Sequence, residues 1–169
     1  MTSYRGLVRE CRAADLPALD SVFPLGDAHR RRLAGQAAGR WLYLIGFAPG
    51  VAGHCLVHWD GPTTASVRAV LPDCVEVNHL YVLEQARGRG VGSALLAEAE
   101  LSAVVRRRTT IGLGVGDDNL DSRRLYTSLG YAPSGARYAV DYDYLDEAGR
   151  VVAAHEAGDF LIKRLPAAG

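Results

Sequence analysis

The stretch Arg87-Gly-Arg-Gly-Val-Gly92 lies mid-chain, between a β-rich run and a helical one. The run before it, Val75 to Val82, is rich in β-branched and aromatic residues and predicts a strand. The helical run extends from Gly90 to about Val105, with apolar residues at helical spacing. Thr110 to Val115 predicts another strand. A strand, a helix and a strand in this order predict a right-handed crossover between parallel strands.

The three alternating glycines of this stretch indicate an anion site. Without side chains at these positions, the backbone can approach a ligand closely and direct several N–H groups at it. The start of the following helix adds about half a positive charge. Arg87 and Arg89 can add charge-assisted hydrogen bonds. The chemistry suits a phosphate or diphosphate, although a tight turn that needs glycine for geometry alone would have the same composition.

Two common phosphate-binding loops are excluded by the spacing. The P-loop pattern Gly-x-x-x-x-Gly-Lys-Ser/Thr is absent from the chain. A dinucleotide fingerprint needs a third glycine where this sequence has Ser93, and an acidic residue about 20 positions later, where Arg106 to Thr110 lie.

The rest of the chain predicts a single domain over residues 1–169, in which a mixed sheet is flanked by helices. Asp60 to Asp73, which contains Pro62 and Pro72, is expected to be a loop or an edge segment. The other expected elements are a strand at Leu7 to Cys11, helices after Asp15 and Asp27, a hairpin of Trp41 to Phe47 with Val51 to Trp59, a helix at Leu120 to Leu129, and a closing pair of Tyr138 to Leu145 with Val152 to Lys163.

Composition narrows the class of protein. The 19 basic residues (Lys and Arg) balance the 19 acidic residues (Asp and Glu), so the formal net charge is zero. No overall positive field therefore attracts nucleic acid or anionic lipid. The three cysteines, without short spacings, predict reduced thiols and no metal site. No apolar run approaches the ~20 residues of a membrane helix. We therefore expect a cytoplasmic protein with no membrane or nucleic-acid partner. The preference for Arg over Lys is a weak sign of a bacterial source with a GC-rich genome.

Two stretches resemble motifs of the GCN5-related N-acetyltransferase (GNAT) superfamily. His79-Leu-Tyr-Val-Leu-Glu-Gln-Ala-Arg-Gly-Arg-Gly-Val-Gly-Ser-Ala-Leu-Leu96 is similar to its coenzyme A motif, Arg/Gln-x-x-Gly-x-Gly/Ala. Both Gln85-x-x-Gly88 and Arg87-x-x-Gly90 satisfy the pattern, and we choose the second because it leads directly into the Ala/Leu-rich helix. Downstream, Asn119 to Tyr131 is similar to Asn-x-x-Ala-x-x-Leu-Tyr-x-x-x-Gly-Phe. The resemblance implies an α/β (α+β) fold with a mixed, mostly antiparallel sheet of about seven strands and about four helices.

The resemblance also implies acetyl-CoA as the acyl donor and assigns residues to it. The pantetheine arm would lie along Leu80, Tyr81 and Val82, and Asn119 would hydrogen-bond near it. Tyr126 matches the family's general acid, although most tyrosines on helices serve packing alone. The diphosphate would lie on the backbone amides of Arg87, Gly88, Arg89, Gly90, Val91, Gly92 and Ser93.

The sequence does not decide whether the general base is Glu76, His79, water or a group from the variable N-terminal region. Glu76 resembles in position the catalytic Glu of the histone-acetylating branch, and His79 has a suitable ordinary pKa. Strict alternation would place Glu76, Asn78 and Leu80 on one strand face, with His79 and Tyr81 on the other, unless a bulge interrupts it.

The expected activity is transfer of an acetyl group from acetyl-CoA to a primary amine of a small molecule or a protein, by direct attack on the thioester. The alternatives are a non-catalytic acyl-CoA-binding module with a sensory or regulatory role and, less favoured, a nucleotide-binding domain. No metal is expected, because His54 and His58 lack a third ligand nearby. Dimerisation through the C-terminal strands is common in the superfamily, so a homodimer is compatible with this interpretation.

Overall fold

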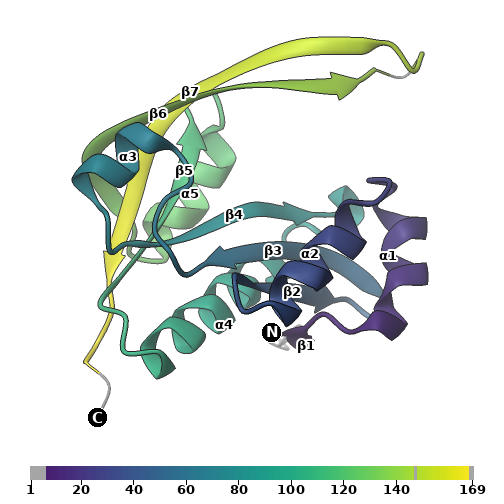
Figure 1. Cartoon of the computed structure of the whole chain (residues 1–169), viewed down its shortest axis with the longest axis horizontal. Helices are drawn as coiled ribbons and strands as arrows, with labels where there is room; N and C mark the ends of the chain where they lie inside the picture. The colour runs from purple at the N-terminus through teal and green to yellow at the C-terminus, as the bar shows by residue number, and fades with distance from the viewer. Residues whose placement is uncertain (1–6, 147, 168–169) are drawn as a thin grey trace.

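A computed structural model describes residues 7–146 and 148–167, which form a seven-stranded sheet in the order β1-β2-β3-β4-β5-β7-β6 (Figure 1). All neighbouring strands are antiparallel except β4 and β5, which are parallel and joined through the predicted crossover helix. The strands are β1 (Leu7–Glu10), β2 (Trp41–Phe47), β3 (Val51–His58), β4 (Val75–Val82), β5 (Thr110–Gly116), β6 (Ala132–Leu145) and β7 (Val151–Arg164). The expected mixed, mostly antiparallel sheet is confirmed.

Five α-helices within the described residues accompany the sheet. They are α1 (Leu16–Val22), α2 (Ala28–Ala37), α3 (Ala65–Val70), α4 (Val91–Val105) and α5 (Leu120–Ser128). The prediction of a loop or edge segment over Asp60 to Asp73 was wrong at α3. This helix lies between Pro62 and Pro72 and is too short to show a helical pattern of apolar residues in the sequence. Burial of Val67 against Tyr138 and Phe160 stabilises this helix through tertiary contacts.

Helices cover both faces of the sheet, and alternation along β2 shows how. Leu42 and Leu44 belong to the buried cluster beneath α4 and α5, which defines what we call the α4 face. Tyr43 and Ile45 belong to the cluster beneath α1 and α2, on what we call the α2 face. Because side chains alternate across a strand, burial on both faces explains why β2 is apolar throughout.

Two glycines bring the start of α4 onto the sheet. A Cβ at Gly46 of β2 would lie 2.8 Å from Cγ1 of Val91, and one at Gly53 of β3 would lie 3.2 Å from the same atom. The absence of side chains there lets the first turn of α4 pack directly on the backbone of the strands. Two glycines far from α4 in the sequence thus set how closely this helix approaches the sheet.

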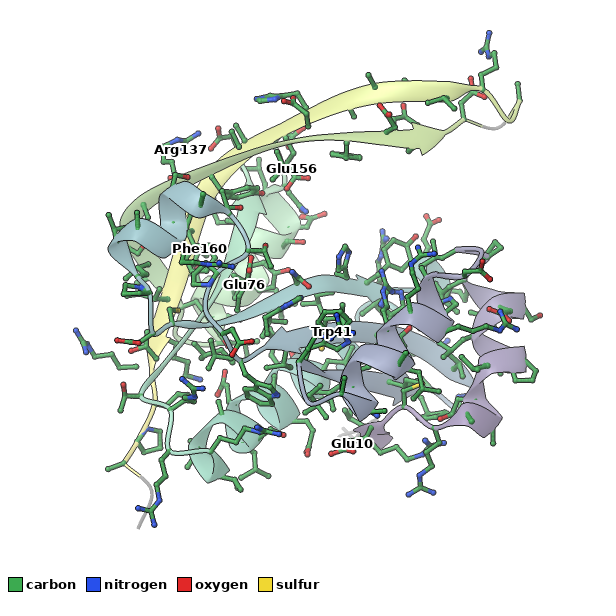
Figure 2. All side chains as sticks on the ribbon, viewed as in Figure 1. Glu10, Trp41, Glu76, Arg137, Glu156 and Phe160 are labelled. Carbon is green, nitrogen blue, oxygen red and sulfur yellow. The ribbon has the colours of Figure 1, made fainter. Side chains whose placement is uncertain are left out.

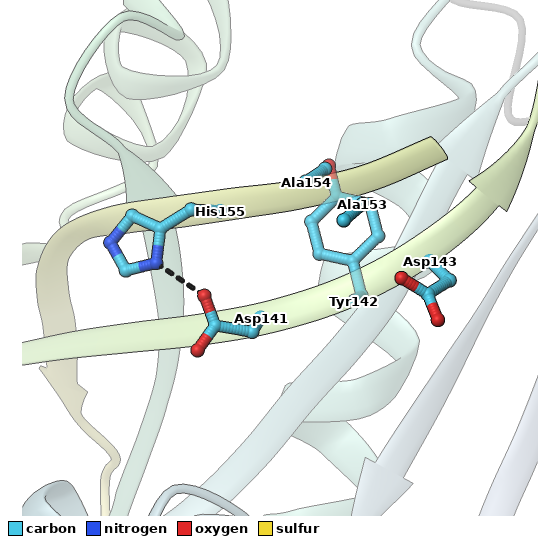
Figure 3. Close-up of a pocket in the computed structure, with 6 residues that line it drawn as sticks. All are labelled: Asp141, Tyr142, Asp143, Ala153, Ala154 and His155. Carbon is cyan, nitrogen blue, oxygen red and sulfur yellow. Dashed lines mark hydrogen bonds and ion pairs between the residues drawn. The ribbon is translucent and has the colours of Figure 1, made fainter. Parts of the chain in front are cut away.

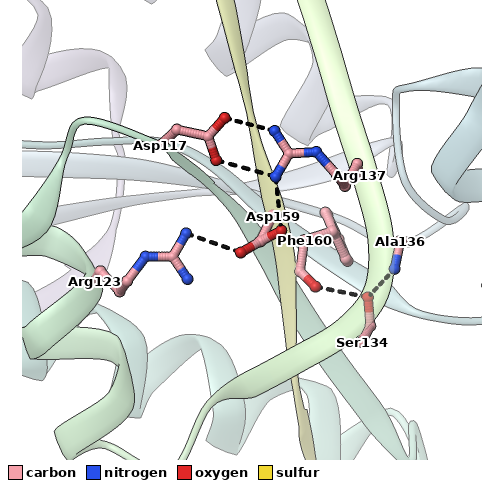
Figure 4. Close-up of polar contacts among 7 residues, drawn as sticks. All are labelled: Asp117, Arg123, Ser134, Ala136, Arg137, Asp159 and Phe160. Carbon is pink, nitrogen blue, oxygen red and sulfur yellow. Dashed lines mark hydrogen bonds and ion pairs between the residues drawn. The ribbon is translucent and has the colours of Figure 1, made fainter.

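The last two strands extend past the remainder of the sheet as a two-stranded arm (Figure 1). β6 begins at Ala132, earlier than the predicted Tyr138, and an irregularity between Pro133 and Arg137 lets the strand continue through a segment whose Pro and Gly favour a break. At the base of the arm, Arg137 contacts Asp117 at 2.5 Å and Asp159 at 2.9 Å. Arg123 of α5 also pairs with Asp159, at 3.0 Å, which ties the arm to α5 (Figure 4).

None of the helices in the described parts of the chain is both long and apolar enough to cross a bilayer.

Candidate active site

The parallel strands β4 and β5 separate shortly after they meet. Their register holds only for Val75 with Ile111 and for Glu76 with Gly112. Beyond this point β5 stays paired with β7 up to Gly116, while β4 continues to Val82 paired with β3 alone. The second half of β4 therefore has backbone groups without a strand partner on its β5 side, where an extended ligand can bind as a strand would.

The glycine loop lies at the open end of β4. Gly88 and Gly90 have φ angles of +73° and +83°, a left-handed backbone that glycine adopts without strain. Gly90 immediately precedes α4, and the first N–H groups of that helix have no intrahelical acceptor. Arg87 Nε donates to the carbonyl oxygen of Val82 at 3.2 Å, which holds the loop against β4, and Arg89 is exposed. The loop therefore has the geometry of an anion site beside the opening.

Tyr126 of α5 is buried on the α4 face, with 7% of its surface exposed. Its ring lies 6.4 Å from that of Tyr131. Burial raises the pKa of its phenol above the ordinary value, and the charge of Glu156 acts in the same direction. The hydroxyl therefore stays protonated at neutral pH and can act as a hydrogen-bond or proton donor.

Asn119 stands just before α5, where its Oδ1 accepts a hydrogen bond from Ser122 N at 3.2 Å. The side-chain oxygen thus caps the helix. Its amide nitrogen remains for a ligand, so the predicted contact near the pantetheine stays a prediction.

A bulge in β4 changes the predicted faces of the strand. His79 has a φ of +50°, and the register between β3 and β4 shifts between His54 and Leu56. The bulge that would interrupt strict alternation is therefore present, and beyond Asn78 the two faces exchange: Leu80 packs on the α4 face with Val75 and Val77. Tyr81 moves to the α2 face, where its ring contacts those of Phe23 and His54.

The two candidate bases lie in different surroundings. Glu76 is 7% exposed and its Oε2 accepts a hydrogen bond from Thr63 N at 2.5 Å. Burial raises the pKa of this carboxyl, a shift that the Thr63 hydrogen bond opposes in part. His79 is an exposed residue, yet the protein around its imidazole and the charge of Arg32 lower its pKa to about 4.

Sequence reasoning missed a buried aromatic cluster on the α2 face. His29 hydrogen-bonds Tyr43 Oη and the carbonyl oxygen of Phe23, each at 2.7 Å. His54 lies among these rings, and burial lowers its pKa to about 3. Phe23 directly follows α1, and the other residues come from α2, β2 and β3, so no short motif could have brought them together.

A hydrogen-bonded pair of side chains that the sequence did not indicate lies at the base of the arm. Tyr138 of β6 donates a hydrogen bond from its hydroxyl to Oε1 of Glu156 on β7. The only sequence signal was the predicted pairing of these two strands.

A shallow hollow of about 590 Å³ lies further out on the arm, lined by Asp141, Tyr142, Asp143, Ala153, Ala154 and His155 (Figure 3). Within it His155 Nδ1 contacts Asp141 Oδ1 at 2.7 Å. Alternation places both of these side chains on the face of the arm opposite Tyr138 and Glu156, whereas Tyr142 and Ala154 of the same hollow share the face of Tyr138 and Glu156.

Residues 10–131 match the model of the acetyltransferase (GNAT) family, and the chain belongs to this family. The resemblance inferred from the two motifs is thereby confirmed. A curated relative, an uncharacterized N-acetyltransferase from Archaeoglobus fulgidus, is 40% identical over 53 residues. That match covers 31% of this chain and spans 36% of the relative's length.

Solved structures share the whole architecture at low identity. A ribosomal-protein-alanine N-acetyltransferase from Brucella melitensis has a TM-score of 0.68 at 23% identity, covering 94% of this chain and 99% of its own. An N-acetyltransferase from Staphylococcus aureus Mu50 has a TM-score of 0.70 at 15% identity, covering 95% and 99%. A phosphinothricin acetyltransferase from Sinorhizobium meliloti, in complex with AcCoA, has a TM-score of 0.66 at 18% identity, covering 95% and 89%. These likenesses establish the fold.

Proposed function

We propose that this protein is an acetyl-CoA-dependent N-acetyltransferase that acylates a primary amine of a small molecule or a protein by direct attack on the thioester. The observation that carries the proposal is the opening between β4 and β5, which ends at the exposed N–H groups before α4. An extended arm with an anionic end fits this combination, and pantetheine diphosphate has that form. When bound, acetyl-CoA supplies the activated acyl group.

The chain's own residues would perform binding and proton transfer. The backbone of Leu80 and Val82 lines the opening, and the amides from Gly88 to Ser93 would bind the diphosphate with the side chain of Arg87, since the Arg87 N–H already donates to the carbonyl oxygen of Glu84. Tyr126, kept protonated by its burial, would donate a proton to the leaving sulfur. A phenol in this role acts over the whole neutral range.

For the base, the surroundings favour Glu76 over His79. A general base works best with a pKa near the operating pH. Burial shifts the pKa of Glu76 upward, toward neutrality, whereas that of His79 is lowered to about 4. Because Thr63 already occupies one oxygen of Glu76, the proton would reach this carboxylate through its other oxygen or a water.

Thiol release from acetyl-CoA, measured across a panel of primary amines and combined with calorimetry using CoA and NAD, tests the proposal. Amine-dependent release with CoA binding is the expected result. CoA binding without turnover on every amine would instead support the non-catalytic acyl-CoA-binding module, and preference for NAD would support a nucleotide-binding domain. A cytoplasmic location and a homodimer remain predictions from the sequence.

A further inference from the structure

Glu156 carries a carboxylate at the bend where the arm leaves the sheet (Figure 2). It is partly buried, and its Oε1 accepts the hydroxyl hydrogen of Tyr138, a residue only 8% exposed. A carboxylate offers about four lone-pair sites, and Tyr138 occupies one of them. The buried ring of Tyr138 thus fixes the orientation of the carboxylate and leaves its second oxygen for another donor.

Strand register places this carboxylate on the α2 face, with Glu76. Paired residues of neighbouring strands share a face, and Tyr138 pairs with Gly158, which pairs with Gly116 of β5. Glu156 is two residues from Gly158 and so lies on the same face. Glu76 pairs with Gly112, which shares the face of Gly116. Figure 2 accordingly shows Glu156 on the inner side of the bend and Arg137 on its outer side.

The glycines of β5 create the space for this pair. A Cβ at Gly114 would lie 2.7 Å from a ring carbon of Tyr138, and one at Gly116 would lie 3.6 Å from Cγ of Glu156. The ring of Tyr138 therefore rests directly on the backbone of β5. Since β5 is the strand that separates from β4, the carboxylate lies beside the opening.

No cation of the described residues forms an ion pair with the carboxylate of Glu156. Among residues 7–146 and 148–167, the ten ion pairs do not include it, while Asp117 and Asp159 at the same bend are both paired with arginine. The negative charge of Glu156 nevertheless acts on the candidate acid. Burial is the main cause of the raised pKa of Tyr126, and the charge of Glu156 is a smaller cause in the same direction. A partly buried carboxylate without a cation is a complementary partner for a cationic ligand.

We propose that Glu156, oriented by Tyr138, binds the ammonium group of the acceptor and makes the site selective for primary alkylammonium substrates. This inference rests on the proposed function, since it names the acceptor group of the same reaction. An ammonium can donate a hydrogen bond to the free oxygen of Glu156. An alcohol of the same shape lacks the positive charge, and a carboxylate is repelled by the negative charge of Glu156. The bound ammonium then gives one proton to the proposed base Glu76, directly or through a water, before its nitrogen attacks.

The test compares Glu156→Gln with Glu10→Gln, an exposed carboxylate on the far edge of the sheet. Glutamine keeps the size of the side chain and still accepts from Tyr138, so the fold should persist. We expect kcat/KM for primary amines to fall about 10- to 100-fold in Glu156→Gln. The Kd for CoA should stay unchanged, and Glu10→Gln should behave like the wild type. Wild-type kcat/KM in Glu156→Gln would overturn the inference, as would an equal loss of CoA affinity.

A second variant tests the orienting role of Tyr138. Gly114→Ala places a methyl group against the ring of Tyr138 and should raise KM for the amine more than it lowers kcat. A fall in kcat alone would contradict the orienting role.

If the wild type acetylates no amine, the proposed function fails, and the subsite is then tested by binding. Benzylammonium is titrated while the backbone amide shifts of Ala157 and Gly158 are followed by NMR. Saturable shifts in the wild type that Glu156→Gln abolishes would support the subsite, and their absence in the wild type would refute it.

Discussion

Replacing Tyr126 by Phe removes one hydroxyl from the candidate acid and leaves its buried ring in place. The ring keeps its packing against Tyr131, so we expect the free energy of unfolding to change by less than about 1 kcal/mol. General acid catalysis contributes about 10²- to 10⁴-fold. A fall in kcat of about 100-fold is the minimum expected, which corresponds to ~2.7 kcal/mol of transition-state stabilisation.

The pH dependence of the wild type follows from the same burial. Burial raises the pKa of Tyr126 above its ordinary value of 10.0, so the acid function is lost only as the pH rises through that raised value. Tyr126 should therefore impose no alkaline decline on kcat in the range where an unperturbed tyrosine is still protonated. A decline near neutral pH would have to come from another group.

Tyr131→Phe is the matched control. Tyr131 is 2% exposed and donates its hydroxyl to Oε1 of Glu100 at 2.9 Å. Its loss should cost about 1 kcal/mol, or roughly 2–4 °C in Tm, with kcat unchanged. Three measurements distinguish the two variants: thiol release in single-turnover experiments for the rate, calorimetry for CoA affinity, and thermal melts for stability. A Tyr126→Phe enzyme whose single-turnover rate stays within threefold of the wild type would refute the acid assignment.

Gly88→Ala and Gly39→Ala introduce the same backbone strain, because the two φ angles are +73° and +74° and neither added methyl would meet an atom within 4 Å. Each should lose about 1 kcal/mol of stability in denaturant melts, while only Gly88→Ala weakens CoA binding, by about 10-fold in calorimetry; equal CoA affinity in the two variants would argue against the loop. Glu76→Gln should be more thermostable than the wild type at neutral pH, and the difference should shrink as the pH falls through the raised pKa of Glu76, since burial favours the protonated acid. If Glu76 is the base, the acidic limb of kcat/KM disappears in this variant; a retained limb excludes it. The three thiols should react with a disulfide reagent only as the protein unfolds, because burial raises the pKa of each to about 12, and rapid reaction of the native protein would contradict this for Cys11, Cys55 and Cys74.

Local patterns were sufficient for much of the fold. The crossover from β4 through α4 to β5 was predicted because apolar spacing and glycine placement act within a few residues of each other. The hairpin of β2 and β3 followed from two apolar runs separated by Pro49-Gly50. In contrast, α3 and the first half of β6 were missed, since their stability comes from contacts with distant strands and not from local propensity.

The sequence by itself determined the glycine-rich loop before α4, because glycine conformation and helix start are local properties. Only the tertiary structure decided which side chains meet across the opening. The bulge at His79 exchanges the faces of Leu80 and Tyr81, and a shift of one position is invisible in a pattern of period two. The contact of Tyr138 with Glu156 depends on the register of two long strands and on bare glycine backbone in a third.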